Sequence, residues 1–189
     1  MSTAVLAPFY ISDVLNVLYR IDGIPAEDLL TDIRRNALFP FLFTRALLPK
    51  LRRVSGPVEV VYCGSLSSSL PIPRIIPYGA TKAFLRQLSA SLGADEKFRP
   101  AGEANVSTLY MDIGSVATLA HPKAASFTTP NAEVFSKHFV HCIGCGMPSI
   151  IPYWPHAILR SLVDVMPQSL LLQTLFKAME EEIAIAKKH

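Results

Sequence analysis

The sequence predicts an α/β protein of the doubly wound class, because strand-like and helix-like segments alternate along the chain. Val58–Cys63 and Val106–Met111 are short runs rich in apolar and β-branched residues, which is typical of buried strands. A helical apolar pattern runs between them from Tyr78 to about Glu96. Since strands joined by helices pair in parallel, we expect ligands at the carboxyl ends of the strands.

The N-terminal part of the chain predicts one further strand and one long helix. A short apolar run within Asp13–Gly23 ends at a glycine and suits a buried parallel strand, whereas nothing ahead of Tyr10 has the pattern of a strand, turn and helix. A helix is expected over residues 27–51, with a break or kink near Phe39 because Pro40 and Pro49 interrupt the pattern.

The C-terminal part of the chain predicts three helices. Asn131 is a favourable N-cap, so the first of them begins near this residue and runs to about Cys142. Glycines and prolines between residues 144 and 155 indicate irregular chain. The last two helices are expected over His156–Val165 and Ser169–Lys188, with Pro167 between them.

Length and composition exclude several classes of protein. The 189 residues suit one domain, and because half of them are hydrophobic and only 17% are charged, a disordered chain is excluded. The net charge of +3 is not gathered into a basic stripe, so nucleic acid is not an expected partner. The cysteines Cys63, Cys142 and Cys145 are odd in number, which fits free thiols in a reducing compartment.

The sequence contains neither a membrane span nor a signal peptide by its pattern. No stretch reaches the ~18 uninterrupted apolar residues of a span, and the first residues, broken by Pro8, lack a basic start. The last two predicted helices carry an apolar face that suits a membrane surface, core packing or a dimer contact, and these alternatives stay open. The residues of that face are Ile158, Leu162, Leu170, Leu171, Leu172, Leu175 and Phe176.

Tyr78 precedes Lys82 by four residues at the start of the central helical pattern. Side chains at this spacing share one face of a helix. An ammonium near a phenol favours the phenolate, so Lys82 is expected to lower the pKa of Tyr78 from its ordinary value of about 10. Such a tyrosine donates a proton to a carbonyl oxygen or accepts one from an alcohol. The spacing alone equally suits two solvated residues.

The segment from His138 to Cys145 contains the pattern H-x-x-H-C-x-x-C, whose spacing suits zinc binding or redox chemistry. The alternative is that both thiols lie on the apolar face of a helix, where cysteines usually pack in the core. His156, which follows Trp154 and Pro155, is also expected to pack rather than to catalyse.

Ser65 and Asn36 extend the Tyr78 pattern to distant parts of the chain. Ser65 lies 13 residues before Tyr78, just after a predicted strand, and Asn36 lies on the preceding helix. With these residues the sequence resembles the short-chain dehydrogenase/reductase family, and in particular its very-long-chain 3-oxoacyl-CoA reductase and hydroxysteroid dehydrogenase branch. The resemblance runs from about Asp13 to the C-terminus. The matching segments are NALFPFLFTRALLP (36–49), GS (64–65), YGATKAF (78–84), GSVAT (114–118) and YWPHA (153–157).

This resemblance implies a catalytic role for four residues. Tyr78 would donate the proton to the substrate carbonyl, and Lys82 would lower the pKa of Tyr78 and bind the nicotinamide ribose. Ser65 would hydrogen-bond the carbonyl oxygen, and Asn36 would hold a water that passes protons to Lys82.

The resemblance also implies a nicotinamide cofactor, NADP or NAD, as the hydride donor. Gly114, Val116 and Thr118 would line its nicotinamide end, together with Tyr78 and Lys82. No metal is expected, because the histidine and cysteine pattern falls in the substrate-loop region of the family. The substrate would be a small-molecule ketone, of the 3-oxoacyl-CoA or ketosteroid type, which is reduced to an alcohol.

Partners and location follow from the same resemblance. Members of the family often form dimers through the helices that carry Asn36 and Tyr78, so a homo- or heterodimer is expected. The branch works at the endoplasmic reticulum, which implies the membrane face of that organelle, with the cytoplasm as the alternative. Peripheral contact with the membrane is compatible with the apolar face of the last helices.

The sequence departs from the family at the cofactor end. It contains no G-x-x-x-G-x-G turn for a pyrophosphate, and Ile113 stands where the family has proline. The expected fold is therefore a partial, Rossmann-like, doubly wound parallel sheet that lacks the first three strands. Residues 1–189 would form a single C-terminal portion of the family's domain. The alternative function is a catalytically inactive, truncated member that serves as an interaction or dimerisation module.

Overall fold

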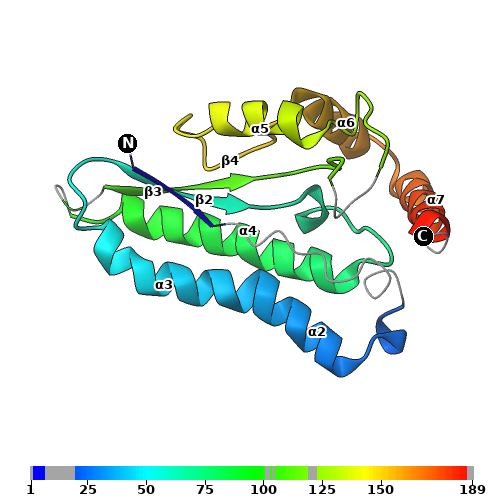
Figure 1. Cartoon of the computed structure of the whole chain (residues 1–189), viewed down its shortest axis with the longest axis horizontal. Helices are drawn as coiled ribbons and strands as arrows, with labels where there is room; N and C mark the ends of the chain where they lie inside the picture. The colour runs from blue at the N-terminus through cyan, green and yellow to red at the C-terminus, as the bar shows by residue number, and fades with distance from the viewer. Residues whose placement is uncertain (1, 7–19, 101–102, 104, 119–122, 187–189) are drawn as a thin grey trace.

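A four-stranded parallel sheet lies at the centre of the molecule (Figure 1). The computed structural model describes residues 2–6, 20–100, 103, 105–118 and 123–186. The strands follow one another across the sheet in chain order, and two of the three strands that the sequence predicts, Val58–Cys63 and Val106–Met111, have the predicted bounds. The strands are β1 (Ser2–Leu6), β2 (Val58–Cys63), β3 (Val106–Met111) and β4 (Ser149–Ile150).

Helices cover both faces of this sheet, as the doubly wound class requires. The helices α3 and α4 lie against one face and α5 lies against the other (Figure 1). The α-helices are α2 (Ala26–Ile33), α3 (Phe39–Leu51), α4 (Ile76–Lys97), α5 (Ala132–His141), α6 (Trp154–Asp164) and α7 (Gln168–Ala186). Shorter helical turns are η1 (Ile21–Gly23), η2 (Arg34–Leu38) and η3 (Leu66–Ser68).

The central strand β2 is buried along its whole length and separates two hydrophobic clusters. Val60 and Tyr62 pack with Leu85 of α4 on one face, and Val61 and Cys63 contribute to the cluster with α5 on the other. Burial of one such side chain stabilises the fold by about 1.5–3 kcal/mol. Two covered faces explain why five of the six residues of the strand are apolar and why even Glu59 is buried.

Two strands differ from the prediction. Ser2–Leu6 forms β1, whereas the sequence pattern shows no strand ahead of Tyr10, and Ser149–Ile150 forms β4 within chain expected to be irregular. Both segments are short, and their strand state depends on hydrogen bonds to β2 and β3. The pattern of residues in a short segment does not reveal which strand the segment will pair with. Of the strand expected within Asp13–Gly23, residues 13–19 lie outside the described residues, and Ile21–Gly23 forms a 3₁₀ turn.

The long helix expected over residues 27–51 is irregular near Phe39, as predicted, but the irregularity is a π turn and not a break. The chain instead stays helical through the π turn η2, in which the Phe39 N–H bonds the Arg34 carbonyl. Pro40 has no N–H to offer, and the wider turn just before it accommodates the proline without a break. The π turn contains Asn36, so it determines the position of this predicted site residue.

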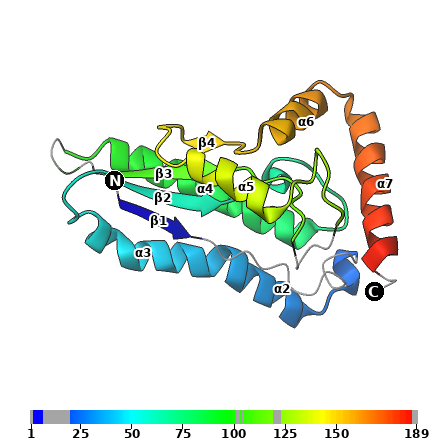
Figure 2. The same ribbon diagram turned by 45° about the horizontal axis from the view of Figure 1, so that its top comes forward.

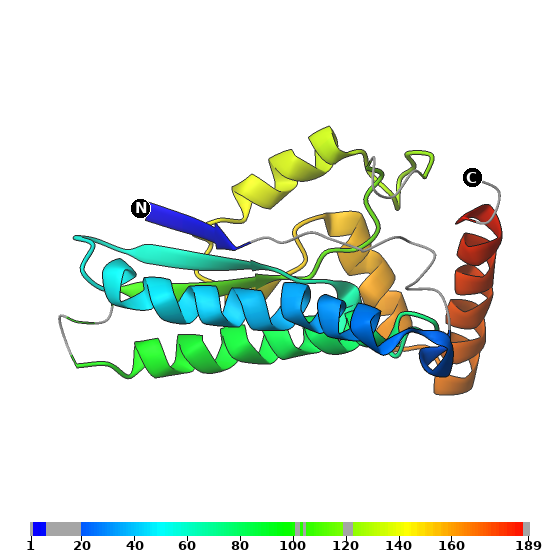
Figure 3. The same ribbon diagram turned by 60° about the horizontal axis from the view of Figure 1, so that its bottom comes forward.

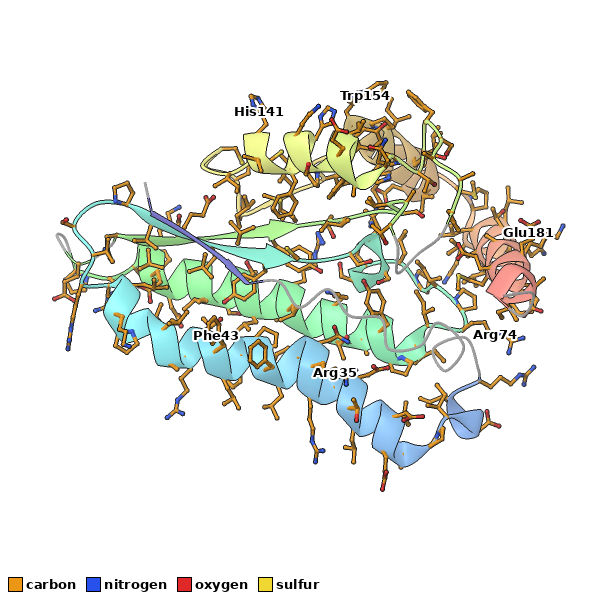
Figure 4. All side chains as sticks on the ribbon, viewed as in Figure 1. Arg35, Phe43, Arg74, His141, Trp154 and Glu181 are labelled. Atoms are coloured by element: carbon orange, nitrogen blue, oxygen red, sulfur yellow. The ribbon has the colours of Figure 1, made fainter. Side chains whose placement is uncertain are left out.

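The C-terminal helices begin and end close to their predicted bounds. Asn131 caps α5, since its Oδ1 accepts a hydrogen bond of 2.8 Å from the Val134 N–H. The helix α7 stands beyond the carboxyl ends of the strands (Figures 2 and 3). Arg74, labelled beside α7 in Figure 4, bonds Glu180 of that helix at 2.7 Å. Among the described residues no helix is long and apolar enough to cross a membrane.

Candidate active site

The carboxyl ends of β2 and β3 bring two predicted site segments to one edge of the sheet. Cys63 ends β2 and leads into the loop with Ser65, and Met111 ends β3 and leads into the loop with Gly114. The two strands are parallel and in register from Val58 to Cys63, so both loops leave in the same direction. The prediction that ligands meet the chain at this edge therefore has a structural basis.

Ser65 is held at the N-cap of η3 by Ser67. The Ser65 Oγ accepts hydrogen bonds from the Ser67 backbone N–H at 3.2 Å and from the Ser67 hydroxyl at 3.0 Å. Because both bonds use the lone pairs of Oγ, the hydroxyl hydrogen of Ser65 remains available as a donor. Hydrogen bonding by the Ser65 side chain is one of the influences on the pKa of Tyr78, and it acts to lower that pKa.

Tyr78 occupies the first turn of α4 and is half-buried. Burial raises its pKa to about 12, and this effect exceeds the lowering by Ser65. The expectation that Lys82 brings the pKa of Tyr78 below its ordinary value is therefore wrong for this structure. The physical reason is that desolvation of the phenolate outweighs the attraction of nearby groups. In this state the phenol is protonated at neutral pH.

Lys82 is one turn further along α4 and is 1% exposed. Its Nζ donates a hydrogen bond of 3.0 Å to the carbonyl oxygen of Cys63, the last residue of β2. The ammonium also lies 5.4 Å from the centre of the Tyr78 ring. Burial lowers the pKa of Lys82 to about 8, so a proton is bound at neutral pH but is less firmly held than on a solvated lysine.

Asn36 is 1% exposed within the π turn η2, which packs against α4. Its Oδ1 has no hydrogen-bond partner among the described residues. A buried amide oxygen without a partner is costly, and such an atom usually faces a water or ligand. Asn36 therefore brings an open acceptor to the helix that carries Tyr78 and Lys82.

The loop after β3 combines a tight glycine with two residues of different burial. A Cβ on Gly114 would lie 2.7 Å from Nδ1 of His156, so only glycine fits against that ring. Val116 is buried in the cluster with Phe135, so its side chain serves the core and only its backbone could meet a cofactor. Thr118 is partly buried at the end of the loop.

His156 packs, as the sequence indicates. It is 1% exposed, and its Nε2 is 3.1 Å from the carbonyl oxygen of Thr128. Burial lowers its pKa, so the ring is neutral at physiological pH. Its position behind Gly114 supports the loop.

In the segment from His138 to Cys145, one of the two cysteines packs in the hydrophobic core. Cys142 is buried in the cluster with Tyr153, whereas Cys145 is exposed. No group of three or more histidine, cysteine or acidic side chains is placed to hold a metal within the described part of the chain.

Sequence reasoning missed a polar network between α4 and the end of β3. Arg86 Nη1 bonds both carboxylate oxygens of Asp112, at 2.7 and 2.5 Å, and lies 3.3 Å from the Ser68 hydroxyl. Tyr110 adds its hydroxyl to the same region. The signal available in the sequence was the spacing of four residues from Lys82 to Arg86, with Asp112 directly after a strand.

Comparison with known proteins shows which sequences and folds this chain resembles. No family model matches the chain. The chain is 30% identical over 168 residues to a very-long-chain 3-oxoacyl-CoA reductase of Aspergillus fumigatus, which covers 83% of this chain and 47% of that protein. A reductase of the same name from Rattus norvegicus is 29% identical over 143 residues, covering 76% of this chain and 44% of that protein.

A further relative is named as an inactive protein. Inactive hydroxysteroid dehydrogenase-like protein 1 of Danio rerio is 30% identical over 136 residues, which cover 72% of this chain and 41% of that protein. The chain therefore spans less than half the length of each of these three relatives.

Solved structures share the fold at low identity. A Brucella melitensis 3-oxoacyl-[acyl-carrier protein] reductase with bound NAD has a TM-score of 0.61 at 16% identity, covering 79% of this chain and 59% of that one. An acetoin dehydrogenase of Enterobacter cloacae has a TM-score of 0.53 at 17% identity, covering 63% and 43%. Because its sequence agrees with those relatives and its sheet and helices agree with those structures, the chain belongs to the short-chain dehydrogenase/reductase family.

Proposed function

We propose that this chain carries the proton-transfer groups of a ketone reductase that uses NADPH or NADH. The observation that supports this most directly is the buried ammonium of Lys82, which lies 5.4 Å from the centre of the Tyr78 ring. The effect of Ser65 on the pKa of Tyr78 adds to this support. Three separate stretches of sequence contribute to this arrangement, since Asn36 lies on the π turn that packs against α4. A protonated phenol, a hydroxyl donor and an ammonium together suit protonation of a carbonyl oxygen.

The chemistry assigned to these residues is reduction of a ketone to an alcohol. The Ser65 hydroxyl donates a hydrogen bond to the carbonyl oxygen and holds it beside Tyr78. The Tyr78 hydroxyl then transfers its proton to that oxygen as negative charge develops there. Lys82 stabilises the resulting phenolate, because its ammonium is buried near the Tyr78 ring and little water competes for the charge.

The residues present fit the nicotinamide end of a dinucleotide. The Oδ1 of Asn36 is a buried acceptor without a partner among the described residues, and it lies on the π turn that packs against the helix of Tyr78 and Lys82. We assign cofactor contacts to Tyr78, Lys82 and Gly114, to Thr118 and to the backbone of Val116. When bound in its reduced form, as NADPH or NADH, the cofactor would supply the hydride.

The substrate class follows from the relatives. Two of them are named very-long-chain 3-oxoacyl-CoA reductases, and we propose a 3-oxoacyl-CoA or a ketosteroid for this chain. The helices α6 and α7 expose apolar side chains that suit contact with a membrane surface, which fits a place at the endoplasmic reticulum. These side chains are Trp154, Ile158, Leu162, Val165, Leu170 and Phe176.

Substitution of Tyr78 tests the function directly. The 189-residue chain should oxidise NADPH or NADH in the presence of a long-chain 3-oxoacyl-CoA, and Tyr78→Phe should reduce kcat by about a thousandfold because the proton donor is lost. The measurement is the loss of absorbance of the reduced nicotinamide, with each cofactor in turn.

Tyr62→Phe is the matched control for this experiment. Tyr62 is also a buried tyrosine, but its hydroxyl pairs with Thr44 at 2.9 Å, between β2 and α3. Loss of that hydroxyl should leave kcat within about twofold of the unchanged chain. Turnover that survives Tyr78→Phe would exclude the proposed mechanism, and absence of turnover with both cofactors would exclude the function for this chain.

A second candidate function is an inactive interaction or dimerisation module. It is favoured by the exposed apolar side chains on one helical stretch, η2–α3, and by the name of the Danio rerio relative. A second copy of the chain, or a longer relative, would cover these side chains. They are Leu38, Phe39, Phe41, Leu42 and Phe43, and Phe84 of α4 meets Phe41 edge to face.

A further inference from the structure

Tyr110 joins the two catalytic segments through a single hydroxyl group. Its oxygen accepts a hydrogen bond of 3.2 Å from the Ser65 backbone N–H, and its hydrogen is donated to the Lys82 carbonyl at 3.1 Å. Tyr110 belongs to β3 and is 1% exposed, so it reaches both segments from the rigid core of the sheet. One buried hydroxyl group thus sets the distance between helix α4 and the loop after β2 that carries Ser65, which is called the serine loop below.

We propose that Tyr110 is a positioning residue, which holds Ser65 in line with Tyr78 by tying the serine loop to the Lys82 turn of α4. It touches neither the substrate nor the cofactor in this role. Its effect on catalysis, which rests on the proposed function, is exerted through the placement of the Ser65 hydroxyl.

Gly64 makes this placement possible. A Cβ at residue 64 would lie 2.0 Å from the Cζ atom of the Tyr110 ring, so the ring occupies the space that any other residue would need. The backbone of the serine loop consequently lies directly against the ring, within reach of its hydroxyl. The glycine directly after β2 and the tyrosine on the neighbouring strand β3 thus fit each other closely.

Charged groups on the other side of Tyr110 restrain its ring. The guanidinium of Arg86 lies 5.3 Å from the ring centre, and its Nη1 is bound to Asp112 at 2.5 Å. This cation–π contact adds to the restraint that packing provides. Burial also raises the pKa of Tyr110, so its hydroxyl keeps the hydrogen that it donates to Lys82.

Hydrogen exchange tests the link between Tyr110 and Ser65 without any turnover. In Tyr110→Phe the ring still fills the space beside Gly64, but the Ser65 N–H loses its acceptor. We expect the Ser65 amide to exchange at least about tenfold faster, measured by NMR on the 189-residue chain. Tyr62→Phe, which removes another buried hydroxyl, should leave the exchange of Ser65 unchanged.

Kinetics test the consequence for the site. If the chain reduces ketones, Tyr110→Phe should lower kcat about tenfold with little change in KM. In the reverse direction, alcohol oxidation depends on the Tyr78 phenolate, whose pKa the Ser65 hydrogen bond lowers. Loss of that placement should move the rising limb of the pH profile to higher pH by about one unit. A merely structural tyrosine would leave the limb in place.

The outcomes separate the two proposals. Unchanged exchange of Ser65 in a folded Tyr110→Phe variant overturns the positioning role, whatever the activity. Faster exchange in a chain without turnover supports the link and counts against the proposed function alone. If the Tyr110→Phe variant does not fold, hydrogen exchange of the unsubstituted chain provides the test. A Ser65 amide that exchanges as fast as an amide in an open loop would exclude the hydrogen bond to Tyr110.

Discussion

At the scale of single residues, Lys82 is the group whose ionisation the fold alters in a directly measurable way. Burial lowers its pKa from 10.5 to about 8, so the folded chain releases this proton at a pH where the unfolded chain still binds it. In that range the unfolded state binds more protons, and stability rises with pH. Above pH 9 the effect is opposed by Cys63, whose pKa burial raises from 9.0 to about 11.

The free energy of unfolding should therefore rise by about 1 kcal/mol between pH 8 and pH 9. Lys82→Met should abolish this rise, because it removes the titrating group while preserving most of the side-chain volume. Urea unfolding at both pH values measures the difference. Lys177→Met on the exposed surface of α7 is the control and should retain the rise. An equal rise in Lys82→Met would show that another group is responsible.

The residue types of the candidate site were predictable from the sequence, but their ionisation was not. Spacing and resemblance identify Asn36, Ser65, Tyr78 and Lys82 in advance. The pKa of Tyr78 lies in the opposite direction from the prediction, because a sequence contains the lysine but not the degree of burial. Tyr110 was not predicted for a similar reason. Its hydroxyl group has a role only because the fold brings Ser65 and the Lys82 carbonyl of α4 to it.

At the scale of elements, α3 and α4 are joined by an ion pair at the end opposite the candidate site. Glu96 near the end of α4 has a side chain that is 0% exposed, and it bonds Arg52 directly after α3 through two nitrogens. Arg99 lies 3.9 Å from the same carboxylate. Loss of Arg52 would leave a buried charge with one distant partner, which is strongly unfavourable.

Arg52→Ala should lower the free energy of unfolding by about 3 kcal/mol. The matched control is Lys137→Ala, which removes an exposed ion pair with Glu133 on α5 and should cost less than about 0.5 kcal/mol. Chemical denaturation of both variants at pH 7 measures these changes. Equal losses would mean that the Glu96 carboxylate is accommodated without its arginine.

Element prediction succeeded where pattern was long and local, and failed where pairing or special backbone decided. The strands 58–63 and 106–111 were correct because they are rich in apolar and β-branched residues and almost every residue in them is buried. Short β1 and β4 exist only through hydrogen bonds to a neighbour. The π turn before Pro40 keeps the helix continuous, and sequence rules record only that proline disrupts a regular helix.

At the scale of the whole molecule, the apolar side chains of η2 and α3 are exposed in the single chain, which suggests that a second chain covers them. Phe39 and Phe43 stack on each other at 5.5 Å and are 54% and 38% exposed. Figure 4 labels Phe43 on α3, the helix that lies beside α4. We expect the chain to be a dimer in solution, because a soluble protein rarely leaves such a patch open to water.

Phe43→Asp should convert this dimer to a monomer, since a carboxylate at the contact cannot be buried without a partner. Analytical ultracentrifugation over a range of concentrations measures the change. Phe98→Asp is the control, because Phe98 is 85% exposed directly after α4 and away from this surface. A chain that is monomeric at every concentration would contradict both the dimer and the interaction module.

The sequence by itself determined the class of fold and the two central strands, and it supplied the residues that we propose for proton transfer, because these depend on local pattern and residue type. The tertiary structure alone decided the pairing of β1 and β4, the burial that moves the pKa values of Tyr78 and Lys82, and the contact of Tyr110 with two distant segments. All three depend on which parts of the chain meet in space and exclude water there, and residue order along the chain does not express that proximity.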